Sequence, residues 1–179
     1  MNNDIAKVLV SEEEIQQRIK EMGEQISRDF ESKNLLMVGV LKGSVVFMAD
    51  LMRHITVPCE IDFMSVSSYG SGTNTSGVVK IIKDLSNPVE GYDVLVVEDI
   101  LDSGVTLSYL LELLKTKGAR SISLVTMLDK PDRRKKPVKL DYKGFTIPDE
   151  FVVGYGLDYD EKYRNLPYIG VLKPEIYSE

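Results

Sequence analysis

Short apolar runs separated by amphipathic stretches constrain the fold of this chain more than any other feature. The runs are "NLLMVGVL", "VLVVEDI" and "SISLVTML", and each has the length and composition of a strand buried on both faces. The intervening "SVVFMADLMRHI" and "TLSYLLELLKTKG" have helical spacing, and Gly118 is a typical C-terminal stop for the second helix. The alternation predicts an α/β fold, in which a central, mainly parallel sheet is flanked by helices.

Finer patterns predict the remaining elements. Ser11 and Glu14 form the Ser-x-x-Glu pattern of a capping box, and a helical stripe follows, made of Ile15, Ile19, Met22, Ile26 and Phe30. In the helix of "SVVFMADLMRHI" we expect an inward face made of Val45, Met48, Ala49 and Met52. In "VPCEIDFMSVSSY" we expect a strand with one face shared by Ile61, Phe63 and Val66. "VVKIIKDL", "EFVVGYGLDY" and "LPYIGVL" are predicted as further strands.

Acidic residues gather where the strand in "VLVVEDILDSGVTL" ends. Glu98 and Asp99 close an apolar run, and no basic residue near them in the sequence could pair with them. Burial of an unpaired carboxylate is costly, so a divalent metal ion or the hydroxyl groups of a substrate would supply the missing partner. An exposed strand terminus, where water solvates both acids, is the alternative interpretation.

The turn Asp102-Ser103-Gly104-Val105-Thr106 leads from that strand into a helix. Backbone N–H groups at a helix start have no partner within the helix and suit an anion, Gly104 permits close approach, and hydroxyl groups add donors. These features predict a phosphate-binding turn, with an ordinary helix N-cap as the alternative. The Gly-x-x-x-x-Gly-Lys-Ser/Thr pattern of a P-loop is absent from the sequence.

Charge and composition disfavour several functional classes. A formal net charge of −6 argues against a nucleic-acid partner, and no apolar run approaches the ~18 residues of a membrane helix. His54 and Cys59 are the chain's single His and single Cys, which are too few for a zinc cluster, and we interpret both as structural. The basic run "RRKK" lies between two prolines and favours a solvated loop. We expect one domain over residues 1–179 and, because a secretory signal is lacking, a cytoplasmic location.

The strand with its acid pair, followed by Asp-Ser-Gly-x-Thr, resembles the PRPP-binding motif of the type I phosphoribosyltransferases. Three further segments resemble the hypoxanthine-guanine branch, in the order that the branch shows: "VGVLKGS", "SSYGSGT" and "FVVGYGLDYDEKYRNLPYIGVL". The similarity spans nearly the whole chain. It implies the type I phosphoribosyltransferase fold, with a small hood over the active site built from N-terminal and C-terminal segments.

The resemblance assigns the sugar-binding residues. Glu98 and Asp99 are expected to hold the ribose hydroxyls of PRPP, partly through magnesium. The 5-phosphate would lie on the backbone of the turn and on two of its hydroxyls, that is, on Asp102, Ser103, Gly104, Val105 and Thr106, with no side-chain role for Val105. Asp102 corresponds to the family's proposed general base near nitrogen 7 of the purine, and helix capping is its alternative role.

Two loops and an arginine are implied to surround the pyrophosphate. Lys42 and Gly43 match the loop that binds it through its backbone, usually with a cis peptide, which would join Leu41 to Lys42. The alternative is an ordinary trans turn. Ser68 and Tyr69 match a lid that excludes water, although that segment alone could be a hairpin or a linker. Arg164 matches an arginine that contacts pyrophosphate and would otherwise be a surface charge.

The purine site is implied to consist of Lys130, Phe151, Val152 and Asp158. Lys130 would donate to the 6-oxo group and Phe151 would stack on the ring. Val152 and Asp158 would offer backbone carbonyls, and the Asp158 carboxylate could hold a second magnesium ion. Without the resemblance, Phe151 and Val152 would be interpreted as core strand residues.

The expected activity is therefore magnesium-dependent transfer of the phosphoribosyl group from PRPP to hypoxanthine or guanine, giving IMP or GMP and pyrophosphate. A xanthine-preferring enzyme is the first alternative. The second is a PRPP-sensing regulator, against which the pI of about 5.0 and the lack of an appended DNA-binding segment argue. Family habit implies a homodimer or homotetramer.

Overall fold

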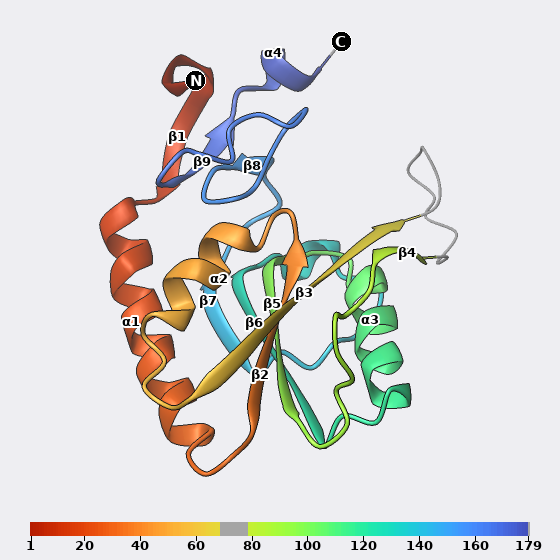
Figure 1. Cartoon of the computed structure of the whole chain (residues 1–179). Helices are drawn as coiled ribbons and strands as arrows, with labels where there is room; N and C mark the ends of the chain where they lie inside the picture. Colours follow the sequence, from red (N-terminus) through yellow and green to blue (C-terminus); the bar gives the residue numbers. More distant parts are fainter. Residues whose placement is uncertain (69–78, 179) are drawn as a thin grey trace.

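The central feature of the computed structural model, which describes residues 1–68 and 79–178, is a six-stranded sheet. Its spatial order is β4 (Val79–Lys83), β3 (Cys59–Ser68), β2 (Leu35–Leu41), β5 (Asp93–Leu101), β6 (Ser121–Asp129) and β7 (Tyr142–Thr146). The pair of β3 and β4 is antiparallel, and the other neighbours are parallel. The predicted α/β architecture is confirmed (Figure 1).

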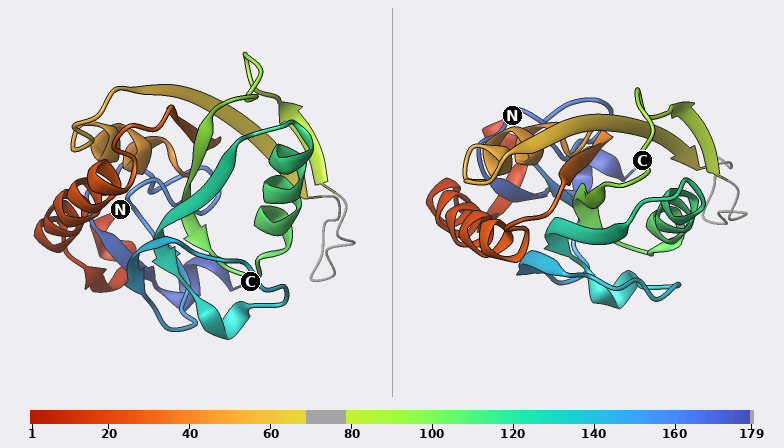
Figure 2. Two further views of the ribbon diagram at one scale, coloured as in Figure 1. Left: turned by 90° about the horizontal axis from the view of Figure 1, so that it is seen from below. Right: turned by 60° about the horizontal axis from the view of Figure 1, so that its bottom comes forward.

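Helices cover both faces of this sheet. α1 (Glu12–Asp29) and α2 (Val45–Met52) lie on one side, and α3 (Val105–Thr116) lies on the other, as the end-on views of Figure 2 show. Each side has its own apolar cluster, because strands covered on both faces bury every side chain in turn. In β5 the run from Val94 to Val97 is fully buried.

The first helix forms as its sequence predicts. The Ser11 hydroxyl accepts from the Glu14 amide at 3.1 Å, and the Glu14 carboxylate accepts from the Ser11 amide at 3.4 Å, which completes the capping box. Five apolar side chains of the predicted stripe are buried: Ile15, Ile19, Met22, Ile26 and Phe30.

The predicted inward face of α2 is largely wrong. Val45 and Ala49 are exposed, and the helix buries Phe47, Met48 and Leu51 instead. A helix this short and this apolar has little amphipathic contrast, so spacing alone did not identify the buried face.

The predicted face of β3 also needs correction. Ile61 is 44% exposed, and the neighbouring face buries Asp62 and Met64. Val66 belongs to the side of Met64 and packs on the α3 cluster, whereas Phe63 packs on the cluster of α1 and α2. The prediction failed because β3 carries apolar residues on both faces near the edge of the sheet, where one face is only partly covered.

A second, three-stranded antiparallel sheet lies beyond the carboxyl ends of the central strands and forms the expected hood (Figure 1). Its order is β1 (Ile5–Val10), β9 (Ile169–Leu172) and β8 (Val152–Val153). The Lys173 amide donates to the Asp4 carbonyl at 2.9 Å, and the Tyr163 hydroxyl donates to the Asp4 carboxylate at 2.9 Å. Short helical turns accompany it: η1 (Asn2–Asp4), η2 (Pro131–Arg133) and α4 (Pro174–Tyr177). The assignment of residues 1–179 to one domain stays a prediction.

The strand order reverses between β2 and β5, which are parallel neighbours. Ligands of open α/β sheets bind outside the carboxyl ends of strands at such a point. Within the described ranges, no helix is both long and apolar enough to cross a membrane.

Candidate functional site

The turn after β5 presents unpaired backbone donors. Gly104 is the N-cap of α3 and has φ +81°, a conformation that glycine adopts without strain. Within residues 1–68 and 79–178, the amides of Asp102, Ser103, Gly104 and Thr106 donate to no protein acceptor. The predicted turn therefore has the donors and the helix start that an anion requires. Asp102 makes no capping hydrogen bond to α3, so the capping alternative for its carboxylate finds no support here.

The acid pair lies at the end of the same strand. Glu98 and Asp99 are half-buried, and neither carboxylate forms an ion pair within the described part of the chain. Burial raises the pKa of Glu98 well above its ordinary value, and the neighbouring Asp99 carboxylate raises it further. Burial also raises the pKa of Asp99. Both acids thus lack a compensating cation.

These two carboxylates fit a magnesium ion better than a transition metal. The described residues bring no three His, Cys, Asp or Glu side chains together as a complete metal cage. Magnesium commonly takes only one or two carboxylates and completes its shell with water and phosphate oxygens. The donor set is therefore suited to an ion that arrives with a phosphorylated substrate.

The loop after β2 packs directly on the acid pair. A cis peptide joins Leu41 to Lys42, as predicted. A Cβ atom on Gly43 would overlap the Asp99 carboxylate, and one on Gly156 would overlap the Gly43 carbonyl. The predicted pyrophosphate loop therefore lies between the end of β5 and the hood.

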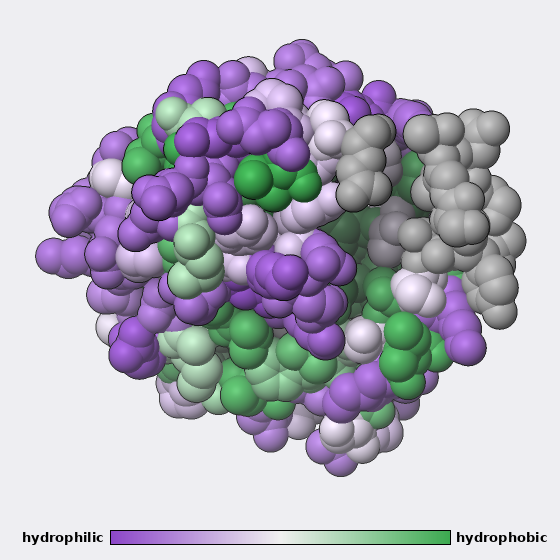
Figure 3. Space-filling view, turned by 90° about the horizontal axis from the view of Figure 1, so that it is seen from above, coloured by the Kyte–Doolittle hydropathy of each residue, from purple (hydrophilic) through white to green (hydrophobic). Residues whose placement is uncertain are grey.

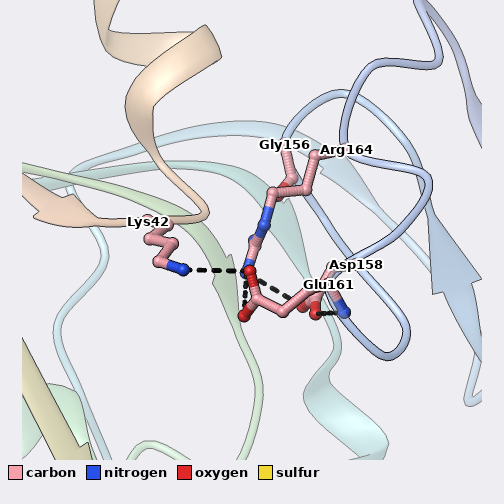
Figure 4. A network of polar contacts seen from close by, with 5 residues as sticks. All are labelled: Lys42, Gly156, Asp158, Glu161 and Arg164. Carbon is pink, nitrogen blue, oxygen red and sulfur yellow. Dashed lines mark hydrogen bonds and ion pairs between the residues drawn. The ribbon is translucent and has the colours of Figure 1, made fainter.

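Arg164 joins the hood to this loop through a small polar network (Figure 4). Its guanidinium donates to the Gly156 carbonyl at 2.7 Å and lies 3.4 Å from the Asp158 carboxylate. Glu161 lies 3.4 Å from the same guanidinium and 3.0 Å from the Lys42 ammonium. Two cations from separate sheets thus converge on one exposed carboxylate, at a place where an anionic ligand could replace Glu161.

Asp102 has a free carboxylate oxygen. Its Oδ1 is buried without a hydrogen-bond partner among the described residues, and the nearest cation is the Arg133 guanidinium, 3.6 Å away. A carboxylate with spare acceptor capacity beside the phosphate turn is placed to accept a proton from a bound ligand.

Lys130 and Phe151 lie on the other side of the turn. The Lys130 amide donates to the Leu101 carbonyl at 2.9 Å, which fixes this lysine beside the end of β5. Its buried ammonium donates to the Glu150 carbonyl at 2.9 Å and keeps further N–H groups for a ligand. The Phe151 ring is 38% exposed, and Tyr177 stacks on it with the ring centroids 4.6 Å apart.

The other predicted purine residues lie close to these two. Val152 buries its side chain in β8, so only its backbone is available for a ligand. Asp158 faces Arg164 and does not lie with Glu98 and Asp99 in one metal-binding cluster of the described residues. Seen from the side of the hood, a hollow with a partly hydrophobic floor opens in a mostly hydrophilic surface (Figure 3). The predicted lid, Ser68 and Tyr69, falls outside the described side chains.

Comparison with known proteins agrees with this geometry. The phosphoribosyl transferase domain family matches residues 8–160. The hypoxanthine-guanine phosphoribosyltransferase of Bacillus subtilis is 59% identical over 178 residues, which cover 99% of both chains. This chain belongs to the hypoxanthine-guanine phosphoribosyltransferase family.

Other members of the family agree with this assignment. A crystal structure of a hypoxanthine phosphoribosyltransferase from Staphylococcus aureus superposes with a TM-score of 0.98 at 55% identity and covers 100% of this chain and 97% of that one. The bifunctional TilS/HprT protein of Listeria monocytogenes is 61% identical over 179 residues. The chain spans only 28% of that longer relative.

Sequence reasoning missed two residues of this phosphoribosyltransferase site. Glu161 was overlooked because its partner Lys42 lies 119 positions away, and nothing local marks the contact. Tyr177 was overlooked because a lone tyrosine near the C-terminus carries no pattern. The run "DYDEKYR" has three acids around the predicted Asp158 and Arg164, and it could have suggested Glu161.

Proposed function

We propose that this chain transfers the 5-phosphoribosyl group of PRPP to hypoxanthine or guanine, producing IMP or GMP and pyrophosphate in purine salvage. One observation carries the proposal above the others. Free backbone donors, an unneutralised acid pair and a loop packed on Asp99 all meet at the reversal of strand order. That arrangement suits a ligand with a phosphate at one end, a diol in the middle and a pyrophosphate at the other.

The sugar is held at both ends. The amides of the turn after β5 bind the 5-phosphate, and Glu98 and Asp99 accept hydrogen bonds from the ribose hydroxyls. Bound magnesium, held by the acid pair and by substrate oxygens, neutralises charge on the departing pyrophosphate. The Lys42–Gly43 backbone and Arg164 bind the same group. With the flanking groups fixed, the anomeric carbon needs only a short movement from pyrophosphate to purine.

The purine is selected by donors and acceptors. Lys130 donates to a 6-oxo group, which favours hypoxanthine and guanine over adenine, whose 6-amino group is a donor. Phe151 supplies the stacking surface, and the backbone of Val152 and Asp158 accepts from the ring edge. The Asp102 carboxylate takes the proton that the ring loses as its nitrogen 9 forms the glycosidic bond.

Turnover of single bases tests this proposal. The purified chain is mixed with PRPP and hypoxanthine, guanine, xanthine or adenine, with magnesium or with excess chelator, and pyrophosphate release is followed. We expect turnover of hypoxanthine and guanine that the chelator abolishes. Faster turnover of xanthine would instead identify the alternative substrate, and tight PRPP binding without turnover would identify a sensor.

The oligomer is part of the same proposal. We expect a homodimer or homotetramer, which sedimentation of the purified chain would distinguish from a monomer.

A further inference from the structure

The basic run Arg133–Lys136 packs on the phosphate turn and is not the fully solvated loop that its sequence predicts. The amides of Lys135 and Lys136 both donate to the Ser103 carbonyl, at 2.8 and 3.0 Å. A Cβ atom on Gly104 would overlap the Lys136 carbonyl. The backbone of this run therefore touches two consecutive residues of the turn.

Arg134 holds the turn from a second direction. Its Nε donates to the Asp102 carbonyl at 3.0 Å, and its Nη2 forms an ion pair with the Asp129 carboxylate. The arginine side chain is 23% exposed and that of Asp129 is 12% exposed. One guanidinium thus connects the end of β6 to the residue that follows β5.

We propose that Arg134 is the positioning residue of the 5-phosphate turn, an inference that rests on the proposed function. The Asp102 and Ser103 carbonyls are held by Arg134 and by the basic run, so they are directed away from the anion. The amides of the turn remain free for phosphate, as their lack of partners in the described chain shows. The same contact fixes the Asp102 backbone, from which the proton-accepting carboxylate extends.

The geometry requires an arginine. A guanidinium donates in two fixed directions at once, here toward a carbonyl and toward a carboxylate. A lysine ammonium is one point charge and can satisfy one of these partners well. Replacement by lysine therefore keeps the charge and the ion pair but loses the hold on the turn.

Steady-state kinetics of Arg134→Lys and Arg134→Ala test the inference. We expect the KM for PRPP to rise about tenfold in the alanine variant and less in the lysine variant, since loss of a charge-assisted contact is commonly worth a factor of this size. The KM for hypoxanthine at saturating PRPP should stay within about twofold of wild type. Arg28→Ala is the matched control, because Arg28 is exposed on α1 and should leave both KM values unchanged.

Hydrogen exchange gives a readout that is independent of turnover. The Lys135 and Lys136 amides are bonded to Ser103, so their exchange should accelerate in both Arg134 variants and not in Arg28→Ala. An unchanged KM for PRPP with unchanged exchange in Arg134→Lys would overturn the inference. An equal loss of kcat and of both substrate affinities with a lower Tm would also overturn it, because that pattern reflects general instability.

The two proposals fail separately. If the wild-type chain releases no pyrophosphate with any purine, the proposed function is wrong and the role of Arg134 in substrate binding falls with it. Normal wild-type turnover combined with wild-type behaviour of the lysine variant would reject the positioning role alone. If the alanine variant does not fold, the lysine variant carries the test.

Discussion

Glu98 and Asp99 show the conflict between stability and function that single residues of this site carry. Burial raises the pKa of both carboxyl groups, so the folded chain without ligand holds two acids in an unfavourable environment. A bound cation or diol would relieve that cost. The pair is therefore more useful to a complex than to the free fold.

Replacement of Glu98 by Gln should stabilise the free protein. With a raised pKa, the folded chain binds the proton more tightly than the unfolded chain, so stability falls as the pH rises from 4.5 through the raised value. We expect Glu98→Gln to gain about 1–2 kcal/mol at pH 7 and to gain nothing below pH ~4.5. Denaturant unfolding at both pH values measures this. A variant less stable than wild type at pH 7 would contradict it, and turnover should fall in every case.

Asp102→Asn separates proton transfer from phosphate binding. The asparagine amide cannot accept a proton, whereas the backbone of the turn is retained. We expect kcat to fall by about 100- to 10,000-fold while the KM for PRPP changes little. Steady-state rates across a range of pH provide the measurement. An unimpaired kcat would assign the proton to another acceptor.

At the scale of single elements, the amino end of β5 is fixed as firmly as its carboxyl end. Asp93 accepts from the Asn34 amide at 3.1 Å and from the Ser121 hydroxyl at 2.7 Å, and it pairs with Arg120. These partners precede or begin the neighbouring strands β2 and β6. The carboxylate therefore helps to set the register of the three strands that carry the site.

Asp93→Asn should weaken the fold in a pH-dependent manner. The hydrogen bonds from Arg120 lower the pKa of Asp93 from 3.8 to about 2, so its contribution is complete above the ordinary value and is lost as the pH falls toward 2. We expect a loss of about 1–2 kcal/mol at pH 7 after allowance for the exposed Arg120, and a smaller difference near pH 3. Unfolding curves at both pH values measure it, with Asp160→Asn on an exposed turn as control. An equal loss at both pH values would contradict the assignment.

Elements were predictable to the degree that their patterns were local. The capping box and stripe of α1 lie within one segment, and both were predicted correctly. β5 was recognised because burial on both faces leaves an unbroken apolar run. The inward faces of α2 and β3 depend on what lies across them, and there the predictions failed. β1 and β7 were not predicted, since each is short and mixed in polarity.

At the scale of the whole molecule, the candidate site exists only where the hood meets the central sheet. The phosphate turn and the acid pair belong to the sheet, whereas Phe151, Val152 and Arg164 belong to the hood. Family resemblance named most of these residues in advance. The contacts that join the two parts, such as Lys42 with Glu161, could not be predicted because they pair residues far apart in the chain.

Gly156→Ala should separate the two parts. Gly156 has φ +97°, and a Cβ atom there would overlap the Gly43 carbonyl, so the added methyl group must displace the hood from the pyrophosphate loop. We expect kcat/KM for PRPP to fall by about 100-fold, because misplacement of binding groups by ~1 Å can cost that much.

Gly91→Ala is the matched control. Gly91 has φ +82° and nothing within 4 Å of the position its Cβ would take, so the substitution introduces backbone strain alone. We expect it to lower the free energy of unfolding by about 1 kcal/mol and to leave kcat/KM unchanged. If both variants lost activity equally, backbone strain and not the close approach would be the cause.

Pairing of β1 with β9 imposes an order on synthesis of the protein. Residues 5–10 leave the ribosome early, yet their partner strand is made of residues 169–172. The central sheet can assemble while the chain is still growing, but β1 must wait for almost all of it. A nascent fragment that stops short of β9 would therefore display the phosphate turn without a completed nucleobase pocket, and translation would have to pass residue 172 before the protein could consume its costly sugar donor.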